Sequence, residues 1–379
     1  MSKSWDIFCA VVDNFGDIGV CWRLARQLAR EHGLQVRLWV DDLQAFHQIA
    51  PDIDPASARQ FHAGVEICHW PSSFPAVSPH QVVVEAFACQ LPDNFVQAMA
   101  ALPDKPIWIN LEYLSAEDWV AGHHALPSPH PSLPLVKHFY FPGFGLDTGG
   151  LLREQGLLEQ RARFQQDGKA QAAFWQELGL PSPRPREKRL SLFAYENAAV
   201  SELLACWTGS ASPISCIVPA SRILPQLAAA LGQATLTPGQ HVKRGALEVH
   251  VLPFLPQERY DRLLWACDFN FVRGEDSFVR AQWAARPFVW QIYPQADEAH
   301  WAKLNAFLAI YSTQLAPTAA SALSRLWRGW NRQAEVAGAW EECLEHATPL
   351  GEHARQWAHD LGSQPDLATS LVQFCKKPL

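Results

Sequence analysis

The sequence of 379 residues contains no long hydrophobic run. No apolar stretch approaches the roughly 18 residues that a membrane-spanning helix requires, so we expect no such helix. The first residues, MSKSWDIFCAVVDN, lead directly into a strand-like segment without an apolar signal region or a cleavage site. We therefore expect a protein of the cytoplasm.

Several motifs of common enzyme classes are also absent. The nine cysteines form no Cys-x-x-Cys pair and no Cys/His spacing typical of a metal site, and several lie in apolar runs, which favours buried, reduced thiols. There is no Gly-x-x-x-x-Gly-Lys-Ser/Thr phosphate loop and no Gly-x-Ser-x-Gly elbow. The segment from Gly143 to Thr148 lacks the third glycine of a dinucleotide fingerprint.

Charge is sparse, with 18% charged residues and a net charge of −7, which argues against a general nucleic-acid binder. Any recognition of phosphate must then be local. Asp52 and Asp54 form the Asp-x-Asp pattern of metal-dependent sugar transferases, but they lie between prolines in an expected surface loop, where solvated carboxylates are the better interpretation. We expect no metal cofactor. The histidines 123, 124, 130 and 138 lack ligand spacing and indicate a solvated or loop-packing role.

What the chain does contain is an alternation of strand-like and helix-like segments, typical of an α/β protein with parallel sheets. We predict two Rossmann-like, doubly wound domains facing a central cleft. Residues 1–180 would form the first domain, 181–355 the second, and 356–379 a helical tail packing back toward the first. The Pro/Gly/His-rich segment 122–150 is expected to be a long structureless loop, 151–178 a helical run, and PSPRPREKR (181–189) a linker. The expected strands are 5–12, 35–40, 81–85, 106–111, 190–195, 213–219, 247–254, 268–272 and 287–292.

The first candidate site follows the strand 5–12. Asp13, the turn residues Asn14-Phe15-Gly16, and Asp17 precede a helix with an apolar stripe. Asp17 has two interpretations: an ordinary helix N-cap worth roughly 1 kcal/mol, or a functional carboxylate. Two carboxylates flanking a Gly turn at the ligand-binding edge of a parallel sheet favour the functional one.

The second candidate site is the turn Arg273-Gly274-Glu275-Asp276-Ser277, between the strand 268–272 and an apolar-faced helix. A helix N-terminus after a glycine turn binds anions through its free N–H groups and its dipole. Ser277 or Asp276 could be a plain N-cap, but an Arg, a Glu, an Asp and a Ser within five residues exceed what capping needs. Other expected strand ends supply Phe193, Tyr195, Phe254 and Gln257, where aromatic rings can stack on a base and an amide can read its edge, although core packing explains each ring alone. Together these residues indicate a nucleotide-diphosphate site.

The second half of the chain resembles the donor domain of two-domain GT-B glycosyltransferases. Retaining members often carry a second Glu eight residues after the first, but Trp283 stands there when counted from Glu275, which favours inversion. More specifically, DNFGDIGVCWRLARQL, NLEYLSAEDWV, FPGFGLDTGGLLRE, SLFAYEN and RGEDSFVRAQWAARPFVWQIYPQ occur in this order. They resemble the bacterial protein-arginine rhamnosyltransferases (the EarP family) that modify translation elongation factor P. The resemblance is weaker through 153–189 and in the tail.

The resemblance implies a metal-independent, inverting transfer of rhamnose from dTDP-β-L-rhamnose to a guanidinium nitrogen of one arginine of elongation factor P, which would activate that factor for ribosomes stalled at polyproline. Asp17 would be the general base with Asp13 close by, and Glu275 would be important for catalysis. The donor pocket would comprise Asn14, Phe15, Gly16, Phe193, Tyr195, Phe254, Gln257 and residues Arg273, Gly274, Glu275, Asp276 and Ser277. The alternatives are a GT-B transferase with another nucleotide sugar or acceptor, and a non-catalytic nucleotide-sugar-binding protein.

Overall fold

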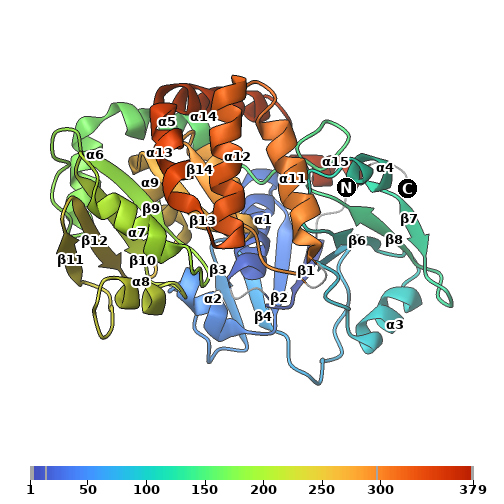
Figure 1. Ribbon diagram of the computed structural model, residues 1–379. Coiled ribbons are helices and arrows are strands. Elements are labelled where there is room, and N and C mark those ends of the chain that lie inside the picture. Colours follow the sequence, from blue (N-terminus) through green and yellow to red (C-terminus); the bar gives the residue numbers. More distant parts are fainter. Residues whose placement is uncertain (1–3, 13–14, 296–297, 377–379) are drawn as a thin grey trace. The chain divides into compact units, whose positions relative to one another are not determined.

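The computed structural model describes residues 4–12, 15–295 and 298–376. The chain forms two compact units, each with its own parallel sheet (Figure 1). Unit 1 comprises residues 1–155 together with 362–379, and unit 2 comprises residues 156–361.

Unit 1 is built on an eight-stranded sheet with the order β3-β4-β2-β1-β5-β6-β8-β7. The inner strands pair in parallel, and an antiparallel hairpin closes each edge, β3 with β4 and β7 with β8. Strand β1 pairs with β2 on one side and with β5 on the other, so the strand order reverses there. The strands are β1 (Ser4–Cys9), β2 (Gln35–Val40), β3 (Arg59–His62), β4 (Val65–His69), β5 (Val82–Ala86), β6 (Ile107–Leu111), β7 (Pro127–Pro129) and β8 (Val136–Tyr140).

The helix after β1 is amphipathic, and its buried stripe includes Val20, Leu24 and Leu28. It ends at Gly33, whose positive φ of 64° suits glycine and whose N–H donates to the Leu28 carbonyl. After unit 2, the chain returns to unit 1 and forms a last helix, α15, which packs against α1. The helices of unit 1 are α1 (Gly16–His32), α2 (Leu43–Ile49), α3 (Asp93–Ala101), α4 (Trp119–His123) and α15 (Leu367–Phe374).

Unit 2 has a six-stranded sheet with the order β11-β12-β10-β9-β13-β14. All neighbours pair in parallel except the hairpin β11–β12. The elements of unit 2 are β9 (Lys188–Leu192), β10 (Ile214–Pro219), β11 (His241–Arg244), β12 (Leu247–Leu252), β13 (Phe269–Arg273), β14 (Phe288–Gln291), α5 (Leu157–Gln166), α6 (Gly168–Glu177), α7 (Val200–Thr208), α8 (Leu224–Ala230), α9 (Gln257–Ala266), α10 (Glu275–Trp283), α11 (His300–Tyr311), α12 (Pro317–Arg332), α13 (Val336–Glu345) and α14 (Ala347–Gly362).

Strand β13 shows how this sheet is covered on both faces. Phe271 packs its ring against Trp207 of α7, at 5.8 Å, and Trp330 of α12, at 5.1 Å. Its neighbour Asn270 donates its amide to the Leu264 carbonyl of α9, at 3.1 Å. Because successive strand side chains point to opposite faces, helices lie on both sides of the sheet. This is the doubly wound arrangement predicted from the sequence.

The boundaries between the compact units differ from the predicted ones. We predicted them after residues 180 and 355, and they lie after residues 155 and 361. Residues 156–180 belong to unit 2 because α5 packs against α9: the Phe164 and Trp265 rings lie 5.9 Å apart, and Gln165 donates to the Trp265 carbonyl. Residues 356–361 also belong to unit 2, since Trp357 donates to Gln282. The segment 181–189 is therefore a loop within unit 2.

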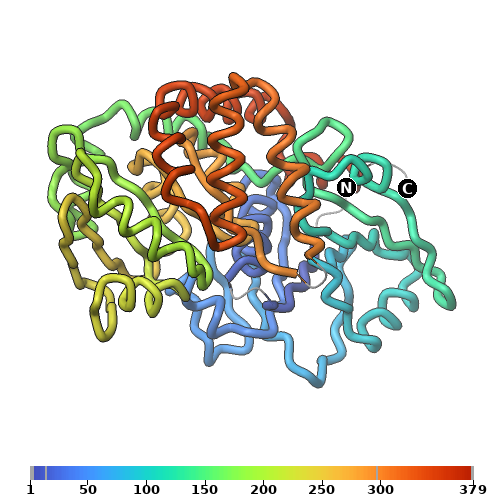
Figure 2. The backbone as a smooth tube through the Cα atoms, in the orientation of Figure 1, coloured from blue at the N-terminus to red at the C-terminus, as the bar shows by residue number. Residues whose placement is uncertain are grey.

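Only the last segment of the predicted tail, 362–379, belongs to unit 1. Arg153 donates to the carbonyls of Gly362 and Gln364, and Gln27 of α1 donates to Asp366. Phe374 of α15 lies 5.5 Å from the Tyr140 ring of β8, so the red end of the tube in Figure 2 lies against this strand.

The expectation of a structureless loop over 122–150 was wrong. The segment contains the hairpin of β7 and β8, which forms one edge of the first sheet. Prolines in β7 concealed it, although an edge strand accommodates proline because one side of the strand needs no N–H donors. The predicted helical run 151–178 begins only at α5 and is interrupted at Asp167, which accepts from the N–H groups of Lys169 and Ala170 as the N-cap of α6.

The cysteines agree with the prediction of reduced thiols: all nine are free, and all but Cys89 and Cys206 are buried. Burial raises the pKa of the Cys9 thiol, and the neighbouring Cys21 thiol and Asp17 charge add to this rise. Among the described residues, no helix combines the length and apolarity needed to cross a membrane.

Candidate active site

The candidate acceptor-side site lies at the carboxyl edge of the first sheet, where the strand order reverses between β1 and β5. In open α/β sheets, ligands bind at such a position because the adjacent loops diverge and leave a crevice. The loops after β1, β5 and β6 all start at this edge. These loops lead to the carboxylate of Asp17, the ring of Phe87 and the hydroxyl of Tyr113.

Asp17 is a buried carboxylate at this edge, and both of its oxygens accept hydrogen bonds. It lies in the first turn of α1 and is 2% exposed. Its Oδ2 accepts from the Val12 N–H at 2.9 Å, and its Oδ1 accepts from the Tyr113 hydroxyl at 3.1 Å. Phe15 is the N-cap residue of this helix, so Asp17 is not an ordinary N-cap. Its carboxylate instead connects the end of the β1 loop to the loop after β6.

The other predicted residues of this turn are only partly described. Asp13 and Asn14 lie outside the described residues, so the structure does not test their roles. Phe15 is half-buried, and its carbonyl accepts from the Gly19 N–H at 3.0 Å in the first turn of α1. Gly16 is buried as the first residue of α1.

Tyr113 is a site residue that the reasoning from residue types did not select. It stacks on Phe87, with ring centroids 4.4 Å apart and an interplanar angle of 17°. Phe87 itself has a positive φ of 57°, and Ala88 and Gln90 share this left-handed backbone. A run of such residues is costly unless the surroundings impose it, and such strain is typical of functional loops. A tyrosine two residues after the end of a strand at the ligand edge was the available signal.

The candidate donor-side site in unit 2 is the junction of β13 and α10. Gly274 has φ 67° and ψ −172°, a conformation nearly restricted to glycine, and its carbonyl accepts from Trp290 Nε1 at 2.9 Å. It is the N-cap residue of α10, so the alternative interpretation of Asp276 or Ser277 as a plain N-cap does not hold. The helix begins at Glu275, which places Glu275 and Asp276 in its first turn, where carboxylates interact favourably with the helix dipole.

Arg273 is held by aromatic rings. Its guanidinium carbon lies 4.6 Å from the Phe193 ring centroid and 4.9 Å from that of Tyr195, and its side chain is buried. These cation–π contacts fix the guanidinium plane. Phe193 and Tyr195 are themselves 6% and 4% exposed, so in this structure they contact Arg273 rather than offer open stacking faces.

The remaining predicted donor residues gather at the same edge. Phe254 is half-buried after β12, and its ring lies 6.1 Å from Phe193 at an angle of 68°. Gln257, the first residue of α9, donates Nε2 to Asp276 Oδ2 at 3.1 Å. This bond ties the starts of α9 and α10 together. Ser277 is buried in the first turn of α10. The structure thus brings together the predicted residues of unit 2.

Each unit therefore carries a polar site at the carboxyl edge of a doubly wound sheet: a buried carboxylate in unit 1, and an arginine with a helix N-terminus in unit 2. Two Rossmann-like units of this kind are the architecture of the GT-B fold. A UDP-glucosyltransferase from Polygonum tinctorium shares the fold at 11% identity, with a TM-score of 0.51 over 100% of this chain and 99% of its own.

The chain belongs to the EarP family, described as elongation-factor P (EF-P) rhamnosyltransferase, which matches residues 5–376. A protein-arginine rhamnosyltransferase of Pseudomonas putida is 52% identical over 379 residues, covering 100% of both chains. A solved structure described as "Structural basis for EarP-mediated arginine glycosylation of translation elongation factor EF-P" is 40% identical, with a TM-score of 0.72 and 99% of both chains covered.

These similarities confirm the predicted family, the GT-B fold and the enzymatic class: the chain is a protein-arginine rhamnosyltransferase. The alternative of a non-catalytic binding protein is thereby set aside. The roles assigned to individual site residues, the expected absence of a metal and the identity of the sugar donor stay predictions.

Proposed function

We propose that this enzyme transfers L-rhamnose from dTDP-β-L-rhamnose to a guanidinium nitrogen of one arginine of translation elongation factor P, with inversion at the anomeric carbon. The observation that carries the proposal is Asp17, a buried carboxylate whose two oxygens accept from Val12 N–H and the Tyr113 hydroxyl. The acceptor follows from the relatives, which are described as acting on EF-P. An acceptor of this kind works with the ribosome, so we propose a cytoplasmic enzyme that activates EF-P for polyproline synthesis.

The acceptor explains why a fixed carboxylate is required. A free guanidinium keeps its proton at neutral pH, and its lone pairs are delocalised, so it is a poor nucleophile. In our proposal, Asp17 binds this group by charge-assisted hydrogen bonds and orients one nitrogen toward the sugar. As the nitrogen–C1 bond forms, the carboxylate accepts a proton from that nitrogen. Asp13, four residues earlier, would assist in binding the guanidinium.

On the donor side, the bond between C1 and the diphosphate oxygen breaks, and the electron pair leaves with dTDP. In our proposal, Arg273 and the N–H groups at the start of α10 stabilise the charge that develops on the diphosphate. Phe193 and Tyr195 hold the Arg273 guanidinium in place through their rings. Glu275 lies next to the N-cap Gly274, where its carboxylate would contact the sugar.

The half-buried ring of Phe254 is the proposed stacking partner of the thymine base. Gln257 donates its Nε2 to Asp276 Oδ2. We propose that this bond positions Asp276, so that the same nitrogen does not read the base edge. Asn14, Phe15 and Gly16 are proposed as further contacts of the donor. Because Arg273 and a helix N-terminus supply positive charge at the diphosphate, we propose that transfer needs no metal ion.

The test is to mix the purified enzyme with dTDP-rhamnose and EF-P and to measure the intact mass of EF-P. The proposal predicts the addition of one deoxyhexose, with EDTA leaving the rate unchanged. A parallel reaction with UDP-glucose tests the alternative donor, and one with an EF-P variant whose modified arginine is lysine tests the acceptor atom. Transfer of hexose, modification of the lysine variant or a loss of activity in EDTA would each contradict the corresponding part of the proposal.

A further inference from the structure

The hairpin of β11 and β12, at the edge of the second sheet, gathers three side chains on one face. His241 of β11 stands directly opposite His250 of β12 in the antiparallel register. Glu248 precedes His250 by two residues on β12 and therefore points to the same face. Opposite residues in a strand pair lie about 5 Å apart at their Cβ atoms, which brings these three side chains within reach of one another.

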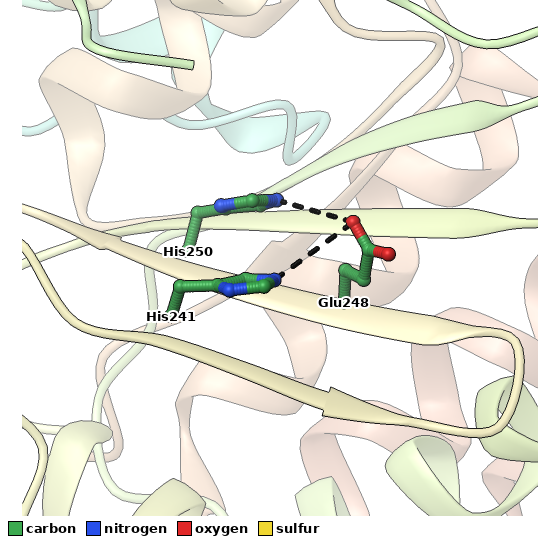
Figure 3. A group of neighbouring side chains, drawn as sticks. All are labelled: His241, Glu248 and His250. Atoms are coloured by element: carbon green, nitrogen blue, oxygen red, sulfur yellow. Dashed lines mark ion pairs between the residues drawn. The ribbon is translucent and has the colours of Figure 1, made fainter. Parts of the chain in front are cut away.

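The three side chains converge (Figure 3). Nε2 of His241 lies 3.8 Å from Glu248 Oε2, and Nε2 of His250 lies 3.9 Å from the same oxygen. The two imidazole rings are stacked, with centroids 4.7 Å apart and an interplanar angle of 15°. The three potential ligand atoms all lie within 4.8 Å of one another.

These separations are too long for direct hydrogen bonds, whose heavy atoms are about 2.7–3.2 Å apart. They are close to the separation of neighbouring ligands around a metal ion, about 3.4 Å for tetrahedral bonds of 2.0–2.1 Å. His241 is the most movable ligand because its side chain is 49% exposed. An imidazole nitrogen coordinates a metal ion in the plane of its ring, so this ring has to rotate out of the stack to share an ion with His250.

The carboxylate of Glu248 is oriented by two cations on its other oxygen. Arg184 Nη1 and Lys243 Nζ each lie 2.8 Å from Oε1. The hydrogen bond from Lys243 is the largest cause that lowers the pKa of Glu248, so this carboxylate is ionised at neutral pH. Oε2 is thereby left on the side of the two imidazoles. This arrangement resembles the outer hydrogen bonds that orient carboxylate ligands in metal sites.

His250 is the more buried of the two imidazoles, which favours its neutral form. Burial, with the nearby His241 adding to the effect, lowers the pKa of His250 to about 4. His250 is therefore a neutral imidazole at pH 7, with a lone pair on one ring nitrogen. Lys243 is the main electrostatic obstacle to a cation, but its side chain is 58% exposed and can turn into solvent.

We propose that His241, Glu248 and His250 bind one divalent transition-metal ion at the edge of the second sheet. Two imidazole nitrogens and one carboxylate oxygen suit Zn²⁺, Co²⁺ or Ni²⁺, whereas Mg²⁺ and Ca²⁺ prefer oxygen ligands. Three protein ligands leave coordination positions for water. The ion joins β11 to β12 and so stabilises the strand that leads to Phe254. It plays no part in the transfer reaction proposed above.

The test is calorimetric titration of Co²⁺ into the untagged, EDTA-treated chain, followed by the visible absorption of the bound ion. The proposal predicts one bound Co²⁺ and at least a tenfold loss of affinity in His241→Phe, which keeps the ring stack, and in His250→Gln. His359→Gln, at an exposed position of α14, is the matched control and should bind normally. No binding by the parent chain, or equal binding by His241→Phe, would overturn the proposal.

A second variant tests the role of the carboxylate. Glu248→Gln keeps an acceptor oxygen for Arg184 and Lys243 but removes the carboxylate ligand, so it should weaken Co²⁺ binding at least tenfold. Binding equal to that of the parent chain would exclude Glu248 as a ligand. Thermal unfolding of every variant with and without Co²⁺ shows whether the hairpin remains folded, and the ion should raise the unfolding temperature only where the site is intact.

Discussion

The two candidate sites fix a charged group in different ways. In unit 1, Asp17 is held by hydrogen bonds from a backbone N–H and a tyrosine hydroxyl. In unit 2, Arg273 is held over the faces of Phe193 and Tyr195. Each charge is opposite to that of the group it would meet, a guanidinium in one case and a diphosphate in the other.

A second arginine of unit 2 shows what a purely structural charge looks like. Arg280 makes two hydrogen bonds with Asp261, at 2.9 and 2.7 Å, and this ion pair is buried within the unit. Its Nε and one of its Nη nitrogens donate to a fixed carboxylate. Arg273 instead lies over the faces of two aromatic rings. We therefore expect a substitution of Arg280 to act on folding and a substitution of Arg273 to act on donor binding.

The largest effect is expected from Asp17→Asn. The amide keeps the shape of the carboxylate and can still accept from Val12, but it cannot accept a proton from the nucleophile. We expect transfer to slow by roughly 10²–10⁴-fold. Single-turnover assays with saturating donor and EF-P measure this rate, and near-normal turnover would exclude Asp17 as the base.

Arg280→Met should act on folding. Removing one partner of a buried pair leaves the Asp261 carboxylate uncompensated, at a cost of about 3–5 kcal/mol of unfolding free energy. Denaturant unfolding measures this loss. Combining it with Asp261→Leu should recover part of the stability. If both single and double variants are as stable as the parent, the pair is not structural.

Arg273→Gln should act on binding instead. Loss of charge-assisted hydrogen bonds to the diphosphate should weaken dTDP affinity by about 10–100-fold, since each is worth about 1.5–3 kcal/mol. The unfolding free energy should fall by less than in Arg280→Met. Calorimetric titration of dTDP gives the affinity. A variant that binds dTDP normally but unfolds easily would reverse the assignments of the two arginines.

Phe254→Ala should weaken dTDP binding by a smaller factor, because base stacking on an aromatic ring is worth roughly 1–3 kcal/mol. Phe254→Trp keeps a stacking face and serves as the control. Calorimetry with both dTDP and inorganic diphosphate distinguishes the base from the phosphates. Equal losses for both ligands would remove Phe254 from the base-binding role.

Tyr113→Phe should have the smallest effect. It keeps the stack on Phe87 and removes only the hydroxyl that donates to Asp17 Oδ1. A lost hydrogen bond to a charged group is worth about 1.5–3 kcal/mol, and water can replace part of it at a partly exposed residue. We expect transfer to slow by about tenfold or less, with dTDP affinity unchanged. A larger loss than in Asp17→Asn would make Tyr113, rather than Asp17, the principal group.

The sequence predicted most of the inner strands because their apolar runs need no tertiary information, but it missed β4, which pairs with β2 and buries Val65, Ile67 and Cys68. Strand β2 matched its prediction, and β13 extends one residue beyond it to Arg273. The β7–β8 hairpin was missed because its prolines and exposed residues resemble a loop. The unit boundary depends on α5 packing against α9, a contact between segments about a hundred residues apart that no local pattern encodes.

The sequence indicated several residues of the candidate sites, but not the contacts that those residues make. Carboxylates and arginine after strands identified Asp17 and Arg273 correctly as neighbours of a sheet edge. The Tyr113–Asp17 bond joins residues 96 positions apart and depends on β1 and β6 ending at the same edge. The contact of Arg273 with Phe193 and Tyr195 similarly required the pairing of β13 with β9.

The central claim is that Asp17 serves the acceptor while the base and the diphosphate of the donor are bound by residues of unit 2. The most direct test is the dTDP affinity of Asp17→Asn, measured by calorimetry on the same preparation used for transfer. The account predicts an affinity within about twofold of the parent chain despite the slow transfer. A loss of dTDP affinity as large as that of Arg273→Gln would contradict it, because Asp17 would then belong to the donor site.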